Sequence, residues 1–438
     1  GKRRGPAARR KARSLEYSLL LTATMCLVAF GVVMVFSASS SASLLGESGD
    51  GTYYLKRTLM FGAIGLLALR VLSIPGMLAT VRRLTPAILV TAIALLLLTK
   101  AIGSSANGAQ RWIELGPIQI QASEIAKIAL LLYGASLLAK RPQMTRDLRG
   151  MMPFLLVAGT CCALIVVEPD LGTAMVTAFS VSALLIAAGA KLRHLALIAG
   201  ALGLFVLVAV LMEPYRMERL TTFLNPGADT AGAGFQSTQA SIAIGSGGIF
   251  GVGLGESVQK AFYLPEAHTD MIAAVVGEEL GLVGLSMLTG LYVMLGFAGF
   301  RTAQRARDRY GRLLAAALTA MILVQASINL FAVLGLAPLT GVTLPFVSYG
   351  NSSLIVTLAA VGLLLNVASG GTATSKAKRP PARGRPAAGG LRVYDGGRGA
   401  RRAAPARRSG GARAARGDRG GRDRRARGAG AGRRRRAR

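Results

Sequence analysis

Long apolar stretches alternate with short charged segments along most of the chain. A transmembrane helix needs about 20 mostly apolar residues to cross ~30 Å of hydrocarbon. By this measure the pattern predicts an all-α integral membrane protein, a bundle of about ten transmembrane helices. The predicted spans cover residues 17–38, 57–75, 84–100, 120–139, 151–167, 171–189, 195–212, 270–299, 313–335 and 351–368. The last two divide one uncharged run at Pro338 and Pro345, because proline interrupts backbone hydrogen bonding.

Three segments stand apart from the predicted bundle. Residues 213–269 form a glycine-rich loop between the seventh and eighth spans, and a connection that long is usually functional. Residues 1–14 form a basic tail that precedes the membrane domain of residues 15–370. The Arg/Gly-rich tail of residues 371–438 is predicted to be disordered, because it cannot bury enough apolar area to order itself.

The composition excludes an ordinary soluble domain and locates the charge. Hydrophobic residues make up 52% of the chain and charged residues only 16%. The net charge of +32 is concentrated in the tails, since residues 376–438 hold 23 Lys/Arg and three Asp. No nucleic-acid partner is expected, because only Tyr394 interleaves an aromatic ring with these arginines. A tail of this kind is expected to hold anionic membrane lipids.

The distribution of bases among the loops predicts the topology. Even-numbered loops hold fourteen Lys/Arg in short segments, whereas odd-numbered loops and their flanks hold seven in longer ones. Basic residues in short loops stay on the cytoplasmic side. Both termini are therefore predicted to be cytoplasmic, and the 213–269 loop extracytoplasmic.

Ionisable groups at the predicted outer boundary are candidates for function, because such groups are costly near a membrane. Glu124 and Lys127 are three residues apart, which puts them on one helix face as a predicted ion pair, either structural or functional. Asp270 opens the eighth span and is either a helix cap or a general base. Arg111 and Asp170 lie at the same predicted boundary.

The glycine-rich segment 245–255 is not read as a nucleotide-binding loop. No strand precedes it and no Gly-Lys-Ser/Thr follows it. The glycines are interpreted instead as letting the loop lie flat against the bundle. His194 and His268 are too few and too separated for a metal cage. The sequence requires no cofactor and leaves metal ligands unknown, although carboxylates could bind a divalent cation, Mg²⁺ or Mn²⁺.

Three longer segments carry a resemblance to a known family: GFQSTQASIAIGSGG at 234–248, SVQKAFYLPEAHTD at 257–270 and PLTGVTLPFVSYG at 338–350. Together with RWI at 111–113, QASEIAK at 121–127 and EPD at 168–170, they resemble the SEDS family of bacterial cell-wall polymerases over residues 15–370. The sequence of residues 257–270 is more similar to the division branch, FtsW, than to the elongation branch, RodA. Ala122 and Asn351 depart from the family pattern, which usually has Pro and Gly there.

The resemblance implies a peptidoglycan glycosyltransferase that polymerises lipid II at the outer face of the cytoplasmic membrane during septal wall synthesis. It makes Asp270 the essential aspartate, which we expect to act as general base while undecaprenyl pyrophosphate leaves. Arg111 and Lys127 would then steady the diphosphate. The remaining candidates, expected to orient sugars or a metal ion, are Glu124, Asp170, Gln236 and Gln239.

The resemblance also implies partners and leaves alternatives open. A class B penicillin-binding protein, which is a transpeptidase, and other division proteins are expected partners, and an FtsZ contact through the tail is a hypothesis. A flippase or transporter for lipid-linked precursors, an elongation-type RodA polymerase and a division scaffold are the competing interpretations.

Overall fold

Ten helices of the computed structural model coincide with the ten predicted spans. The structure describes residues 14–45, 49–106, 109–115, 118–225, 232, 234–260 and 263–372. The ten helices are α1 (Leu15–Leu45), α2 (Tyr53–Leu72), α3 (Met77–Ile102), α4 (Ala122–Lys140), α5 (Leu148–Val167), α6 (Leu171–Ala188), α7 (Leu192–Leu211), α10 (Ile272–Arg305), α11 (Arg309–Val333) and α12 (Asn351–Ala368). The expectations for the two tails fall outside the described residues.

Nine helices within the described residues are long and apolar enough to cross a membrane. Helix α2, which corresponds to the second predicted span, is not among them. Its 20 residues include Lys56, Arg57 and Arg70, which lowers its hydropathy. It nevertheless packs along α12, where a Cβ on Gly65 would lie 2.6 Å from a Leu358 methyl carbon. The chain is therefore a multi-pass membrane protein.

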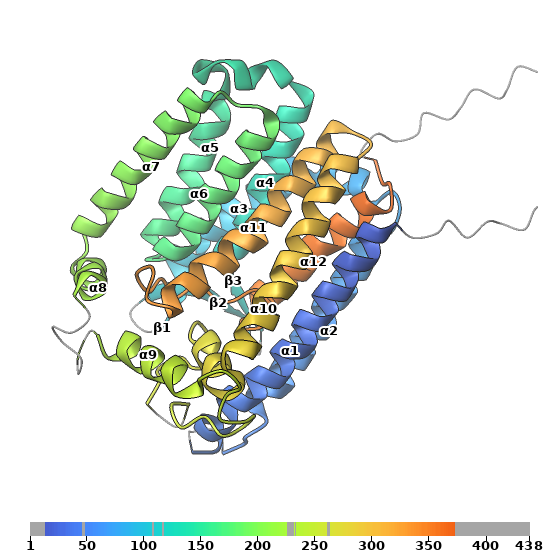
Figure 1. The fold of residues 1–438 in the computed structure, drawn as a ribbon. Coiled ribbons are helices and arrows are strands. Elements are labelled where there is room, and N and C mark those ends of the chain that lie inside the picture. The colour runs from blue at the N-terminus through green and yellow to red at the C-terminus, as the bar shows by residue number, and fades with distance from the viewer. Residues whose placement is uncertain are drawn as a thin grey trace, which may run out of the picture. The chain divides into compact units, whose positions relative to one another are not determined.

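The helices form a bundle with α11 near its centre. Helix α11 packs against α10, α6 and α4, while α1 packs on α10 and α2 on α12 (Figure 1). Two thirds of the apolar stretch of α11 is buried, against 17% for α7, which lies at the edge of the bundle (Figure 1). Among the nine apolar spans, the two most buried ones, α4 and α12, are less hydrophobic than the outward-facing α7, as expected when the surrounding solvent is lipid.

A small sheet between α3 and α4 adds three short strands to the predicted helical bundle. Strands β1 (Ser104–Ala106), β2 (Ala109–Leu115) and β3 (Ile118–Gln121) pair antiparallel in the order β1-β2-β3. The alternation of polar and apolar residues in Gln119, Ile120 and Gln121, after a Gly-Pro pair, was the available strand signal. Ser352 fixes β3 to the start of α12, because it accepts from the Gln121 amide and donates to the Gln119 carbonyl.

The connection between α7 and α10 contains two further helices, α8 (Pro214–Leu224) and α9 (Phe235–Gly247). Figure 1 shows both at the same end of the bundle as the sheet. A short 3₁₀ helix, η1 (Pro142–Arg146), joins α4 to α5 at the other end. One end of the bundle therefore gathers nearly all the structure that lies outside the spans.

Helix α10 is broken at Gly281, which the sequence pattern did not predict. Gly281 has φ 62° and ψ −159°, a conformation that glycine adopts without strain. The glycine-rich segment passes over the break: the Leu282 amide donates to the Gly248 carbonyl, and the Val252 amide donates to the Glu278 carbonyl. A Cβ on Gly251 would lie 2.1 Å from the Glu279 carbonyl oxygen. The interpretation that these glycines let the loop lie flat against the bundle is confirmed.

Two acidic side chains at this break hold the loop in place. Glu278 accepts from the Ser257 hydroxyl and from the Val258 amide. Glu279 is fully buried, pairs with Lys260 at 2.8 Å and accepts from Ser37 of α1 at 2.7 Å. The loop, α10 and α1 are therefore joined through one buried ion pair.

Replacing Lys260 by Met should destabilise the protein strongly. The substitution leaves the Glu279 carboxylate buried without its cation, which costs about 3–5 kcal/mol. Thermal unfolding of the purified protein in detergent measures the effect. Lys56→Met is the matched control, because its partner Asp50 and Lys56 itself are exposed and such a pair contributes about 1 kcal/mol or less. Equal losses in the two variants would contradict the assignment.

Candidate active site at the sheet end of the bundle

Asp270 lies just before α10 and is nine-tenths buried. The cap position of α10 belongs to Met271, so the interpretation of Asp270 as a helix cap is wrong. Its carboxylate accepts from the Thr269 hydroxyl at 3.3 Å, and a Cβ on Gly341 would lie 3.9 Å from Oδ2. The carboxylate is therefore held beside a glycine that leaves one flank without a side chain.

Burial and neighbouring charges set the proton affinity of Asp270. Burial is the largest cause and, with the nearby carboxylate of Glu266, raises the pKa of Asp270 to about 6, while Arg219 acts in the opposite direction. A carboxyl group with this pKa is mostly ionised at neutral pH and can still accept a proton with a useful driving force. Asp270 is thus suited to general-base chemistry.

A cavity of about 580 Å³ lies between α8, α9 and the segment after α11, and Asp270 itself does not line it. Arg219 of α8 lines it and donates to the Leu339 carbonyl at 2.9 Å. Gln236 of α9 also lines it and donates weakly, at 3.4 Å, to the Pro265 carbonyl. Gln239 lies three residues further along α9, half-buried on the same helix face. The two predicted glutamines thus belong to one helix beside the cavity.

Two amide side chains of α11, which the sequence analysis missed, position the segment next to Asp270. Asn329 donates to the carbonyls of Asp270 and Val342, both at 2.7 Å. Gln325, one helical turn away, donates to the Thr343 carbonyl at 3.0 Å. Their four-residue spacing in an apolar helix was the available signal, because a buried amide in a membrane span needs a partner.

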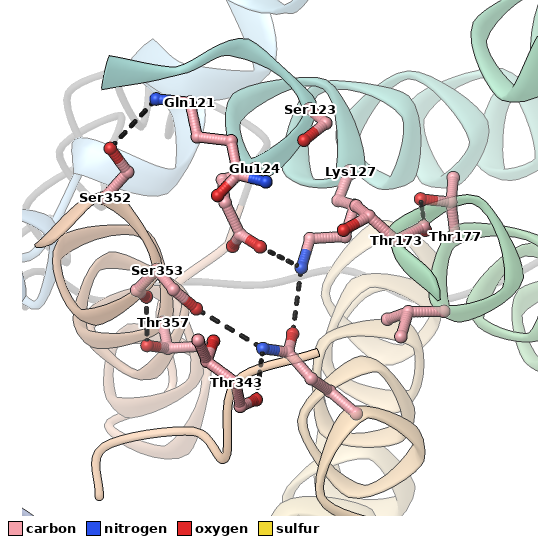
Figure 2. Close-up of polar contacts among 12 residues, drawn as sticks. Gln121, Ser123, Glu124, Lys127, Thr173, Thr177, Thr343, Ser352, Ser353 and Thr357 are labelled. Carbon is pink, nitrogen blue, oxygen red and sulfur yellow. Dashed lines mark hydrogen bonds and ion pairs between the residues drawn. The ribbon is translucent and has the colours of Figure 1, made fainter. Parts of the chain in front are cut away.

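The predicted Glu124–Lys127 ion pair is confirmed, with 2.7 Å between Nζ and Oε1. Both side chains are buried, and Lys127 also donates to Gln325 Oε1 at 2.8 Å. Figure 2 shows this network where α4, α11 and α12 meet, with Ser353 hydrogen-bonded to the same Gln325 amide group. A continuous polar chain therefore runs from the ion pair through α11 to the segment beside Asp270.

Arg111 and Asp170 meet at the turn between α5 and α6. Arg111, on β2 and outside the fourth span, donates to the Pro169 carbonyl. Asp170 caps α6 by accepting from the Thr173 amide, and it also accepts from Gln121 and Ser123. These contacts join the sheet and α4 to the α5–α6 turn, so both residues have structural partners.

Glu168 is the least satisfied acid of this turn. It is 1% exposed, and neither carboxylate oxygen has a hydrogen-bond partner within the described residues. Burial first, and Asp170 second, raise the pKa of Glu168 to about 8, against opposing effects of Arg111 and Lys100. The described residues contain no group of three or more His, Cys, Asp or Glu side chains arranged to hold a metal ion. The nearby cations also disfavour a metal at Glu168.

Comparison with known proteins identifies the family of this chain. The cell cycle protein family that groups FtsW, RodA and SpoVE matches residues 17–372. The probable peptidoglycan glycosyltransferase FtsW of Trichlorobacter lovleyi is 41% identical over 83% of this chain and 96% of that protein. Stage V sporulation protein E of Bacillus subtilis is 40% identical over 80% of this chain and 96% of its own. The chain belongs to the SEDS family.

Solved SEDS structures share the fold. RodA of Thermus thermophilus covers 82% of this chain and 97% of its own, with a TM-score of 0.59 and 30% identity. A chain in a structure described as "Structural coordination of polymerization and crosslinking by a peptidoglycan synthase complex" covers 82% and 98%, with a TM-score of 0.67 and 31% identity. The SEDS membrane domain therefore accounts for nearly all of the described residues.

Glu168→Gln should remove a pH dependence of stability. A group whose pKa is raised on folding contributes stability that is fully present below its ordinary pKa of 4.5 and is lost as pH rises through about 8. The variant is neutral at all pH values, so its melting temperature relative to wild type should rise between pH 5 and pH 9. Thermal unfolding across that range measures it. Glu114→Gln, an exposed acid on β2, is the control. A pH-independent difference for Glu168→Gln would refute the assignment.

Proposed function

We propose that this chain is a peptidoglycan glycosyltransferase of the division type, which polymerises lipid II at the outer face of the cytoplasmic membrane. The observation that carries the proposal is Asp270, a buried carboxylate in a SEDS fold with a pKa of about 6, within electrostatic reach of Arg219, which lines a cavity. The relatives named as probable peptidoglycan glycosyltransferases, and the similar solved chain from a complex that coordinates polymerisation with crosslinking, support the same activity.

In the proposed reaction, a carboxylate oxygen of Asp270 takes the proton of the acceptor sugar's 4-hydroxyl. The hydroxyl oxygen attacks the anomeric carbon of the donor from the face opposite the leaving group. The bond from that carbon to the phosphate oxygen breaks, and undecaprenyl pyrophosphate departs with the electron pair. The products are a glycan longer by one disaccharide, with inverted configuration, and a protonated Asp270 that returns its proton to water.

Arg219 is the proposed cation for the departing diphosphate, because it lines the cavity and its charge acts on Asp270. Lys127 is assigned a positioning role, since its ammonium group is held by Glu124 and Gln325. Arg111 and Asp170 are proposed to fix the α5–α6 turn at the rim, and Gln236 and Gln239 to contact sugars. A divalent cation would be bound by the substrate's phosphates, and activity with and without a chelator tests this.

The proposed setting follows the predicted topology. Both termini are assigned to the cytoplasm and the 213–269 connection to the outer face, at the division septum. A class B penicillin-binding protein is the proposed partner, because one similar solved chain belongs to a complex that coordinates polymerisation and crosslinking.

Asp270→Asn should abolish polymerisation, because an amide cannot accept the hydroxyl proton. General-base removal typically costs 10²–10⁴-fold in rate. The assay follows glycan strands formed from lipid II by the purified complex with its transpeptidase partner. Unchanged binding of the partner and unchanged melting temperature are the controls. A variant that polymerises at the wild-type rate would exclude Asp270 as the base, and lipid II translocation without glycan product would favour a flippase.

Two neighbouring substitutions should shift the pH profile in opposite directions. The rate should rise with pH through about 6, because the ionised form of Asp270 is the base. Glu266→Gln removes a negative charge that raises the pKa of Asp270, so the midpoint of the acidic limb should fall. Arg219→Gln removes a positive charge that lowers it, so the midpoint should rise. Initial rates from pH 4.5 to 8 measure both shifts, and shifts in the same direction would contradict the assignment.

A further inference from the structure

A second cavity lies at the end of the bundle opposite Asp270. It has a volume of about 680 Å³ and is lined by residues at the start of α1 and at the ends of α2, α10 and α12. Because α10 begins next to Asp270 and ends at Arg305, this cavity is separated from the candidate active site by the full length of that helix. The proposed polymerase reaction makes no use of it.

The charged lining of this cavity is strongly basic. Three arginines from different segments reach it: Arg70 at the end of α2, Arg305 at the end of α10, and Arg307 in the connection to α11. The acid in the lining is Glu16, which already pairs with Arg301 at 3.1 Å and with Arg305. Within the part of the chain that the structure describes, Arg70 and Arg307 take part in no ion pair.

The helix dipoles and Glu16 do not neutralise all of the positive charge of these arginines. The carboxyl ends of α2, α10 and α12 and the amino end of α1 together contribute roughly one negative charge. Four arginines, counting Arg301, against Glu16 and these helix ends leave roughly two positive charges. The cavity therefore has an uncompensated attraction for an anion.

The uncharged part of the lining combines apolar side chains with hydroxyl groups, which favours an anion that also carries an apolar portion. Leu21, Leu69 and Val367 line the cavity among the arginines, and Ser14 and Ser73 add hydroxyl groups. Four apolar helices end here, which is the depth at which lipid phosphates lie. Basic pockets between transmembrane helices, on the side where basic loops gather, suit anionic lipid head groups. The flanking tails are themselves basic, so their charge does not match the cavity.

We propose that the cavity between α1, α2, α10 and α12 binds the phosphate of an anionic phospholipid through Arg70, Arg305 and Arg307. The acyl chains extend along the apolar surface beside α1 and α2, and the hydroxyl groups contact the head group. Such a site joins the first and last spans to α10 at the end of the bundle away from the chemistry.

The test uses the full chain in nanodiscs that contain a photoreactive phosphatidylglycerol. Peptide mapping of the crosslinks reports the site separately from lipid held by the tails. Crosslinks are expected at residues 14–21, 69–75, 302–307 and 367–370. Arg70→Gln with Arg307→Gln should reduce them by roughly thirtyfold, which corresponds to two bases at ~1 kcal/mol each.

The matched control is Arg146→Gln with Arg149→Gln, two exposed arginines at the same predicted membrane side but outside the cavity. This control should leave the crosslinks unchanged, and both double variants should keep the wild-type melting temperature in lipid-free detergent. Phosphatidylcholine should not compete, whereas unlabelled phosphatidylglycerol should. Displacement by inorganic phosphate alone would reassign the site to a free anion. Absence of crosslinks at these segments, or equal loss in the two double variants, would overturn the proposal.

Discussion

The cost of placing ionisable groups in an apolar bundle governs this structure. Each buried charge must find a partner or give up its charge, because the lipid offers no substitute for water. Glu124 with Lys127 and Glu279 with Lys260 take the first course. Each pair is also hydrogen-bonded to a segment far away in sequence, the first to Gln325 and the second to Ser37. Glu168 takes the second course, since burial raises its pKa to about 8.

Asp270 differs from both classes. It keeps Arg219 within electrostatic reach, yet burial still raises its pKa. It is therefore neither fixed as an anion in a strong pair nor neutral at physiological pH. A carboxylate balanced in this way can exchange a proton with a bound substrate.

The sequence predicted the spans well because a single physical property, apolar length, decides them. The range 351–368 matches α12 residue for residue, and the other helices begin or end within a few residues of expectation except at the long ends of α1, α3 and α10. The break at Gly281 could not be predicted, because it depends on hydrogen bonds from a loop some 30 residues earlier. The small sheet was missed because its strands are short and lie beside stronger helical signals.

The candidate site was predictable only in part. Asp270 and the Glu124–Lys127 pair stand out because charges near apolar runs are rare. Gln325 and Asn329 carry no charge and lie in an apolar helix, so only their contacts with the segments around Thr343 and Asp270 reveal their role. Arg219 is one of several bases in a long connection, and nothing local in the sequence separates it from Arg216, which caps α7 and α5 instead.

The positions of Lys127 and Arg219 decide which of these two cations is better placed to contact a departing diphosphate. The Glu124–Lys127 pair is neutral as a unit, so its field falls off faster than that of a single charge, and Lys127 already donates to two acceptors. Arg219 lines an open cavity, and its charge is strong enough there to oppose the effect of burial on Asp270. A diphosphate in that cavity would meet the guanidinium directly, and the bidentate geometry of arginine suits phosphate oxygens. In the proposed mechanism, transition-state charge is therefore stabilised from α8 rather than from α4, and the buried pair holds α4 and α11 in register around Asp270.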